Sequence, residues 1–322
     1  MKIIFMGTPD FAVPSLEILL DKGYDVVAVV TATDKLGGRG GNQLLESAVK
    51  KFAVSRRIPV LQPEKLRSPD FLEQLRSYNA DLQIVVAFRM LPEVVWAMPK
   101  IGTFNLHGSL LPKYRGAAPI NWAIINGEQE TGATTFFLRH EIDTGDLLFQ
   151  AKMPIDEDET AGEIHDRMMH LGANLVLKTV QAIELGDYVL QKQDDSQACH
   201  APKIFHETCE IDFGKTTVEV HNFIRGLSPF PGAWFVVKNV LTREDGTPWQ
   251  SESWDKLLGV ELKVYKTEKE LATHDFPPGH FITDGKKTLK VATLDGFVHL
   301  MELQVQGRKR LGAVDFLNGL KS

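Results

Sequence analysis

The segment FNLHGSLLPKYRGAAP, which begins at Phe104, places an amide and an imidazole two residues apart. Asn105 and His107 alternate with apolar residues and are followed at once by a glycine, a pattern typical of a strand that ends in a turn. Both side chains then point to the same side of that strand. Further along, the segment EIDTGD supplies a carboxylate, Asp143, close to Gly145. A carboxamide, an imidazole and a carboxylate that converge at one place form a plausible acyl-transfer site.

The surrounding sequence predicts a sheet that brings these groups together. Short apolar runs predict strands near residues 2–7, 24–31, 58–62, 81–88, 102–108 and 133–140. Helical spacing of apolar residues predicts helices near residues 15–23, 44–57, 68–78 and 161–185. Strands that alternate with helices indicate a doubly wound α/β domain with a parallel sheet. Ligands of such sheets bind at the carboxyl ends of the strands, where Asn105, His107 and the Asp143 loop are expected.

The character of the sequence changes near residue 189. Residues 189–208 are polar and weakly periodic, which predicts a linker, and short strand-like runs separated by Gly and Asp turns follow it. Such runs predict a small C-terminal β-barrel. The length of 322 residues suits two domains. We therefore expect a catalytic domain at 1–188, the linker, and a C-terminal domain at 209–322.

Several classes of protein are disfavoured. FMGTPDF has one glycine where the dinucleotide fingerprint needs three, and the chain has no phosphate-binding Walker loop. The region around Ser109 lacks the G-x-S-x-G elbow of a serine hydrolase. Cys199 and Cys209 have no metal-ligand partner at a suitable spacing, so we expect no metal site. The net charge of −6 argues against a surface devoted entirely to nucleic acid.

The sequence also predicts where the protein resides. Its start, MKIIFMGTPDF, lacks the long apolar region of a signal peptide, and no apolar run reaches the roughly 18 residues of a membrane span. Two cysteines are too few for a disulfide framework. We expect a cytoplasmic monomer without membrane association.

On residue types alone, two readings of these groups stay open. Asn105 and His107 could form a hydrogen-bonded pair at a strand end, with no part in chemistry. The chain could then be a non-catalytic RNA-binding α/β protein. The Asp143 turn favours the acyl-transfer site instead, because it adds a carboxylate at the same edge of the predicted sheet.

Four segments together closely resemble the methionyl-tRNA formyltransferase family: FMGTPDFAVPSL, NLHGSLLPKYRGAAPINWAIINGE, DTGD and LSPFPGAW. The N-x-H-x-S-L-L-P block is specific to folate-dependent formyltransferases as a class. MGTPDFA and the glycine-rich DKLGGRG narrow the resemblance to the tRNA-acting members. The resemblance implies a Rossmann-like catalytic domain joined by a linker to an OB-like C-terminal barrel.

The resemblance also implies a reaction and its residues. The formyl donor is 10-formyltetrahydrofolate, and the acceptor is the α-amino group of methionyl initiator tRNA, a substrate of translation initiation. Asn105, His107 and Asp143 match the catalytic residues, and Arg39 matches an arginine used near the acceptor end of the tRNA. The folate-binding positions are Ser109, Leu110, Leu111, Pro112, Phe88 and Met90. A related enzyme that formylates a nucleotide-linked amino sugar or a ribonucleotide amine would share the catalytic residues, so they do not separate the two.

The expected mechanism uses Asn105 and His107 as donors to the formyl oxygen, where negative charge develops. Asp143 accepts the proton that the attacking amine must lose, and it holds His107 in its useful protonation state.

The sequence departs from the family pattern at a few positions. Phe88-Arg89 stands where relatives often have a small aromatic-glycine pair, Glu141 precedes Ile142 where Gly-Leu is common, and His206 stands where a second lysine is common. Basic residues form two clusters that could contact phosphate: Lys35, Arg39, Lys50, Lys51, Arg56 and Arg57, and then Lys286, Lys287, Lys290 and Arg308 to Arg310.

Overall fold

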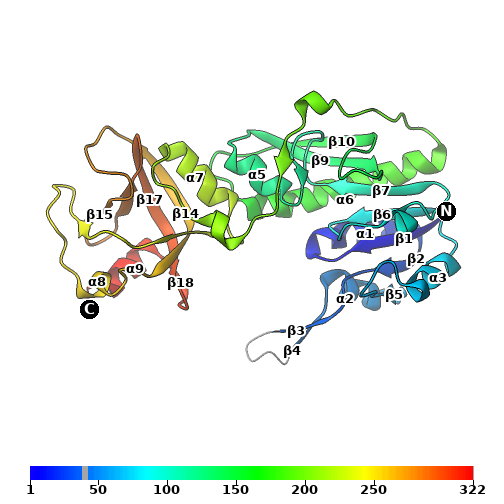
Figure 1. Cartoon of the computed structure of the whole chain (residues 1–322), viewed down its shortest axis with the longest axis horizontal. Coiled ribbons are helices and arrows are strands. Elements are labelled where there is room, and N and C mark those ends of the chain that lie inside the picture. Colours follow the sequence, from blue (N-terminus) through cyan, green and yellow to red (C-terminus); the bar gives the residue numbers. More distant parts are fainter. Residues whose placement is uncertain (38–42, 322) are drawn as a thin grey trace. The chain divides into compact units, whose positions relative to one another are not determined.

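The computed structural model of the chain describes residues 1–37 and 43–321 (Figure 1). These residues form two compact units. The first contains Met1–Pro119, Glu130–Pro154 and His165–Ala201, and the second contains Ile120–Gln129, Ile155–Ile164 and Pro202–Ser322. No helix within the described part of the chain is long and apolar enough to cross a membrane.

The first unit is built on a mainly parallel sheet. Its strands are β1 (Lys2–Gly7), β2 (Asp25–Val30), β5 (Val60–Leu61), β6 (Leu82–Val86), β7 (Gly102–His107), β9 (Glu130–Phe137) and β10 (Leu147–Pro154). Their order across the sheet is β10-β9-β7-β6-β1-β2-β5. The strands from β7 to β5 run parallel, whereas β9 and β10 are antiparallel to their neighbours. The predicted parallel α/β sheet is confirmed, but β10 was not predicted and β9 ends at Phe137 rather than near residue 140.

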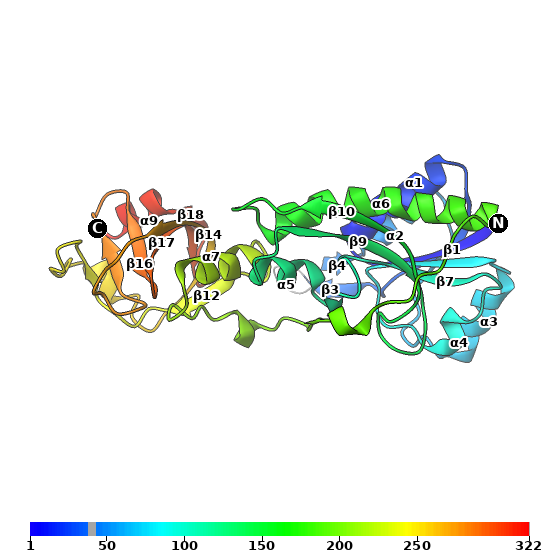
Figure 2. The same cartoon turned by 90° about the horizontal axis from the view of Figure 1, so that it is seen from above.

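Helices cover both faces of this sheet, as Figure 2 shows for α1 and α6 on one side and α3 and α4 on the other. The helices are α1 (Val13–Asp21), α2 (Ala48–Ser55), α3 (Pro69–Ser77), α4 (Glu93–Trp96) and α6 (Ala161–Leu185). On one face, Gly172 of α6 packs against Leu106 of β7. On the other, Phe71 and Val95 share a buried core with Met6. The sheet is therefore doubly wound, which buries its strands on both sides.

The basic run predicted as a helix at 44–57 divides into two elements. β4 (Gln43–Leu45) pairs with β3 (Lys35–Gly37) in an antiparallel hairpin, and α2 begins only after Ser47. The Ser47 hydroxyl accepts a hydrogen bond from the backbone N–H of Lys50, which is an N-cap. That cap fixes the helix start four residues later than the apolar spacing suggested. Arg39 lies outside the described residues, between the two hairpin strands.

The polar segment predicted as a linker contains ordered structure. Residues His200–Ala201 form β11, which pairs in parallel with β8 (Arg115–Gly116). The 3-10 helix η2 (Asp195–Gln197) precedes it. This part of the segment belongs to the first compact unit, and the second unit resumes at Pro202.

The second unit contains an antiparallel-rich sheet. Its strands are β12 (Ala233–Val236), β13 (Leu241–Thr242), β14 (Glu261–Leu271), β15 (Phe281–Thr283), β16 (Leu289–Ala292), β17 (Gly296–Val305) and β18 (Arg310–Gly312). The order is β12-β14-β17-β16-β15-β13, with β18 also paired to β17. Because β12 and β13 do not pair with each other in the described residues, the sheet is open, and the closed barrel predicted from the sequence is not found.

Helices of the second unit were not predicted from the sequence. They are α5 (Pro119–Ile125), α7 (Thr217–Gly226), α8 (Glu252–Asp255) and α9 (Ala313–Gly319). α7 begins with a capping box in which Thr216 and Glu219 satisfy each other's backbone N–H groups. Its Ile224 packs into the core with Phe235 and Leu303 of the sheet.

Candidate active site

The carboxyl end of β7 carries the two polar residues singled out in the sequence. Asn105 pairs with Val85 of β6, and His107 pairs with Thr134 of β9. Leu106 between them points toward α6, where it meets Gly172. Asn105 and His107 therefore face the opposite side of the sheet, as strand alternation predicts.

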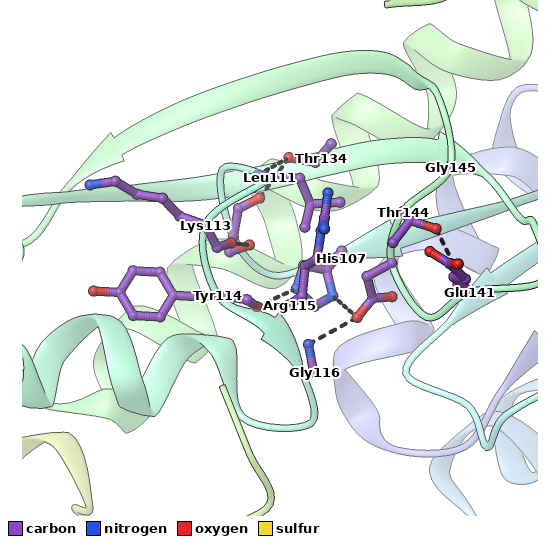
Figure 3. A network of polar contacts seen from close by, with 12 residues as sticks. His107, Leu111, Lys113, Tyr114, Arg115, Gly116, Thr134, Glu141, Thr144 and Gly145 are labelled. Carbon is purple, nitrogen blue, oxygen red and sulfur yellow. Dashed lines mark hydrogen bonds and ion pairs between the residues drawn. The ribbon is translucent and has the colours of Figure 1, made fainter. Parts of the chain in front are cut away.

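The hydrogen-bond partner of His107 determines which ring nitrogen carries a hydrogen. Nε2 lies 2.8 Å from the backbone carbonyl oxygen of Tyr114 (Figure 3). A carbonyl oxygen can only accept, so Nε2 must donate. Nδ1 lies 3.8 Å from Oδ2 of Asp143, and the imidazole ring is buried. When His107 is neutral, its Nδ1 and Oδ2 of Asp143 are both hydrogen-bond acceptors, and they face each other. A proton on Nδ1, or a donor group of a ligand, would fit between them.

Asp143 lies in the turn between β9 and β10. Its φ of 56° is in the left-handed region, which is unusual for a residue other than glycine. The backbone N–H of Gly116 donates to Oδ2 of Asp143 over 2.9 Å. Gly145 lets this turn fold back closely, because a Cβ there would lie 1.7 Å from the carbonyl oxygen of Phe137. The turn geometry thus brings the Asp143 carboxylate to the ring of His107.

The carboxamide of Asn105 is half-buried and lies beside this pair on the same strand. Within residues 1–37 and 43–321, no protein group forms a hydrogen bond with it. Its two N–H donors therefore have no protein acceptor in the described part of the chain. No three or more His, Cys, Asp or Glu side chains in the described ranges are grouped so that they could hold a metal ion.

The Ser109–Pro112 segment is fixed by hydrogen bonds within the protein. The hydroxyl of Ser109 donates to the carbonyl of Lys113 over 2.6 Å. Thr134 donates to the carbonyl of Ser109 and accepts from the N–H of Leu111. The side chains of Ser109 and Leu111 are buried, whereas Leu110 and Pro112 are half-buried. The segment can therefore offer a ligand its backbone and the edges of Leu110 and Pro112, but not the Ser109 hydroxyl.

The residues after β6 present a partly apolar surface. Phe88 is half-buried and packs against the core beneath α3 and α4, and Met90 is 75 % exposed. The guanidinium of Arg89 donates to the carbonyls of Pro63 and Glu64. Arg89 therefore ties this segment to a neighbouring loop.

The predicted basic clusters are partly neutralised where the structure describes them. Four of their cations pair with carboxylates: Lys50 with Asp34 and Glu46, Arg56 with Glu17 and Asp21, Lys290 with Glu270 and Glu244, and Arg310 with Glu302. His206 stacks on Trp234 and contacts Glu261. Net positive charge on these surfaces is therefore smaller than the sequence count suggests.

Sequence reasoning missed the backbone groups that orient the site. The carbonyl of Tyr114 fixes the ring of His107, and the N–H of Gly116 fixes the carboxylate of Asp143. Tyr114 has a φ of 60°, which turns its carbonyl toward the ring. Backbone groups leave no residue-type signal, although the glycine of KYRG could have drawn attention to this turn.

Comparison with known proteins places this chain among the formyl transferases. The family model described as "Formyl transferase" matches residues 1–180, and "Formyl transferase, C-terminal domain" matches residues 203–321. The chain is 52 % identical to the methionyl-tRNA formyltransferase of Parabacteroides distasonis, over 100 % of this chain and 96 % of that protein. It is 46 % identical to that of Flavobacterium johnsoniae, over 99 % and 96 %.

Solved structures share the fold at lower identity. WlaRD, a sugar 3N-formyl transferase crystallised in the presence of dTDP and 5-N-formyl-THF, superposes with a TM-score of 0.63 at 23 % identity. The match covers 96 % of this chain and 99 % of WlaRD. The match to the two bacterial relatives decides the family, because it extends over nearly the full length of each protein. The chain belongs to the methionyl-tRNA formyltransferase family.

Proposed function

We propose that this enzyme transfers the formyl group of 10-formyltetrahydrofolate to the α-amino group of methionyl initiator tRNA. The observation that carries the proposal is the Nδ1 atom of His107 facing the carboxylate of Asp143, beside the carboxamide of Asn105, which has no hydrogen-bond partner among the described residues. The full-length relatives named methionyl-tRNA formyltransferase support the acceptor. WlaRD, solved with a formyl-folate, supports the donor class.

His107 and Asp143 receive the proton of the attacking amine. The α-amino group must attack as the free base, and its nitrogen gains positive charge as the new C–N bond forms. Nδ1 of His107 is the ring nitrogen without a hydrogen, because Nε2 donates to Tyr114. Nδ1 therefore takes the proton, and the carboxylate of Asp143, 3.8 Å away, stabilises the resulting imidazolium.

The same proton then assists the departure of the folate nitrogen. His107 holds it on Nδ1, from which it can pass to that nitrogen as the old C–N bond breaks, so one proton moves from acceptor to donor and the ring returns to neutral. Asn105 donates its carboxamide N–H to the formyl oxygen while that oxygen carries negative charge. His107 can donate there only in its doubly protonated form, which refines the role expected from the sequence.

The donor site is proposed at the segments on either side of this edge. 10-Formyltetrahydrofolate supplies the formyl carbon and a flat, partly apolar ring system. Met90 and Ile142 expose apolar side chains next to the strand ends, at 75 % and 59 % exposure, which fits such a ring. Phe88 and the backbone of Ser109, Leu110, Leu111 and Pro112 complete the proposed wall.

The tRNA is proposed to contact Arg39 and the second unit. One row of residues crosses the sheet of that unit on a single face: Trp234, Lys263, Gln304 and Arg310 are register partners on β12, β14, β17 and β18. Arg310 lies 3.9 Å from the ring centre of Tyr265. Aromatic and basic side chains on a sheet face are typical of nucleic-acid platforms, including OB-like ones. We keep 1–188, 189–208 and 209–322 as catalytic, linker and tRNA-binding regions of a cytoplasmic monomer.

A formyl-transfer assay tests the proposed function. Labelled 10-formyltetrahydrofolate is incubated with the purified chain and either methionyl initiator tRNA, free methionine, or a nucleotide-linked amino sugar. We expect transfer to the tRNA at a kcat/KM far above that for the other amines. Preferred transfer to the amino sugar would assign the chain to the alternative acceptor class.

A further inference from the structure

We propose that Gln193, in the segment predicted to be a linker, is a positioning residue that holds Asp143 for proton transfer. Its side-chain Nε2 donates to the backbone carbonyls of both Asp143 and Gly145, each over 2.8 Å. Both carbonyls belong to the turn between β9 and β10 that carries Asp143, which we call the catalytic turn. The inference rests on the proposed role of Asp143 and assigns a function to a residue fifty positions away from it along the chain.

The carboxamide of Gln193 uses its full hydrogen-bonding capacity in this position. While Nε2 donates to the two carbonyls, Oε1 accepts from Nε and Nη2 of Arg115 over 3.1 and 2.7 Å. An amide has two donor hydrogens and an oxygen that accepts two hydrogen bonds, so every site is engaged. A side chain bound at four points has little freedom to move, and it transmits that rigidity to its partners.

These contacts control both the backbone and the carboxylate of Asp143. Arg115 precedes Gly116, whose N–H donates to Oδ2 of Asp143 over 2.9 Å. Gln193 therefore contacts the backbone of Asp143 directly. Through Arg115 it also contacts the strand β8, whose Gly116 binds the carboxylate of Asp143. Such contacts are needed because Asp143 has a φ of 56°, and a non-glycine residue persists in that conformation only when its surroundings impose it.

The segment that carries Gln193 is itself fixed on both sides. Before it, Gln191 and Leu147 exchange two backbone hydrogen bonds of 2.8 and 3.0 Å. After it, β11 pairs with β8, and the N–H of Tyr114 donates to the sulfur of Cys199 over 3.2 Å. The first part of the linker region, residues 191–201, is therefore held against the catalytic turn at both ends, and we call it the strap.

The test compares Gln193→Ala with a matched control in the same segment. Gln197 is exposed, and its Nε2 donates to Asp194 and to no other described residue, so Gln197→Ala should retain full activity. For Gln193→Ala we expect kcat to fall by about 10–10²-fold, the loss that misplacing a catalytic group causes. KM for folate and for the acceptor should change less than about two-fold, since neither substrate touches Gln193 in the proposed site.

A double-mutant cycle separates positioning from general structural support. If Gln193 acts through Asp143, adding Gln193→Ala to Asp143→Asn should lower the single-turnover rate no further. Multiplying losses would overturn the proposal. Gln193→Glu keeps the contacts with Arg115 but turns an oxygen toward the two carbonyls, so it should be at least as slow as Gln193→Ala. Wild-type turnover in Gln193→Glu would also overturn it.

The outcome is distinguishable from a failure of the proposed function. If the wild-type chain formylates an amine other than methionyl-tRNA, the acceptor assignment is wrong, and the same cycle is run with that amine. If Gln193→Ala loses activity together with a lower melting temperature, while Gln193→Glu is native in both, the residue is structural and the proposal fails.

Discussion

Nδ1 of His107 and Oδ2 of Asp143 lie 3.8 Å apart, too far for a direct hydrogen bond. The opposite ring nitrogen is occupied by the carbonyl of Tyr114. The pair therefore leaves a proton-accepting position open at the carboxyl edge of the sheet. This spacing supports the proposal that the site takes a proton from an amine without first breaking an internal bond.

Asp143→Asn should lower kcat by about 10²–10⁴-fold, because the neutral amide cannot stabilise the imidazolium of His107. An amide oxygen can still accept from the N–H of Gly116, so the turn should keep its shape. Single-turnover transfer to methionyl-tRNA measures the effect. Asp146→Asn is the control: Asp146 pairs with Arg139 nearby, and its loss should have little effect. Native kcat in Asp143→Asn would remove Asp143 from the mechanism.

Asn105→Ala should reduce kcat by roughly 10²–10³-fold with little change in KM for folate, because its donor matters most when the formyl oxygen is charged. Asn105→Asp should be at least as slow, since a carboxylate would face the developing negative charge. Steady-state kinetics with both substrates measures the split. A raised KM with native kcat would instead show that Asn105 only binds the ground state.

Gly145→Ala should deform the catalytic turn, because its Cβ would overlap the carbonyl oxygen of Phe137. We expect a loss of roughly 1–3 kcal/mol in the free energy of unfolding, together with lost activity. Gly319→Ala is the matched control: it is in α9, and, apart from its chain neighbours and the backbone of its own helix, no described atom lies within 4 Å of the added Cβ. That change should be neutral or stabilising by about 0.5–1 kcal/mol. Denaturant unfolding of both variants compares them, and equal stability would contradict the overlap.

His221, on α7, should make stability fall in acid. The pKa of His221 is lowered from 6.5 to about 4, chiefly by burial; the charges of Lys269 and Arg225 contribute to the lowering, and Asp158 opposes it. Above pH 6.5 His221 is neutral in both the folded and the unfolded chain, so it does not reduce the free energy of unfolding. As the pH falls from 6.5 to 4, the unfolded chain takes up the proton first, and the free energy of unfolding drops by on the order of 3 kcal/mol.

Denaturant unfolding of wild type and His221→Gln across this pH range checks the effect. The variant removes the titrating group, so its stability should depend less steeply on pH between 6.5 and 4. The difference between the two curves isolates His221 from the carboxylates that also titrate. Parallel curves would show that His221 does not titrate as stated.

Arg39→Ala should weaken use of the tRNA while leaving folate KM unchanged. A phosphate contact should also make the effect of the substitution smaller at higher salt, because counterion release then contributes less. Lys35→Ala, at the start of β3 and four residues before Arg39 in the sequence, serves as a comparison for general loss of positive charge. Kinetics at two salt concentrations measures both. Unchanged tRNA kinetics in Arg39→Ala would contradict a contact with the acceptor.

The sequence predicted the parts of the fold that depend on local periodicity. The parallel strands of the first unit and the long helix Ala161–Leu185 follow from runs and spacings of apolar residues, which burial between sheet and helices requires. Asn105 and His107 were found for the same reason, since alternation along β7 places both on one face. These features are fixed by residues close together in the chain.

The tertiary structure decided what depends on distant partners. β10 could not be predicted because the pattern of its exposed and buried residues depends on its pairing with β9. The C-terminal sheet is open because β12 and β13 do not pair with each other among the described strands. The contacts from which we propose a positioning role for Gln193 could not be predicted for the same reason. A polar residue in a weakly periodic segment is indistinguishable from a solvated linker residue until folding brings it against carbonyls 50 and 48 positions away.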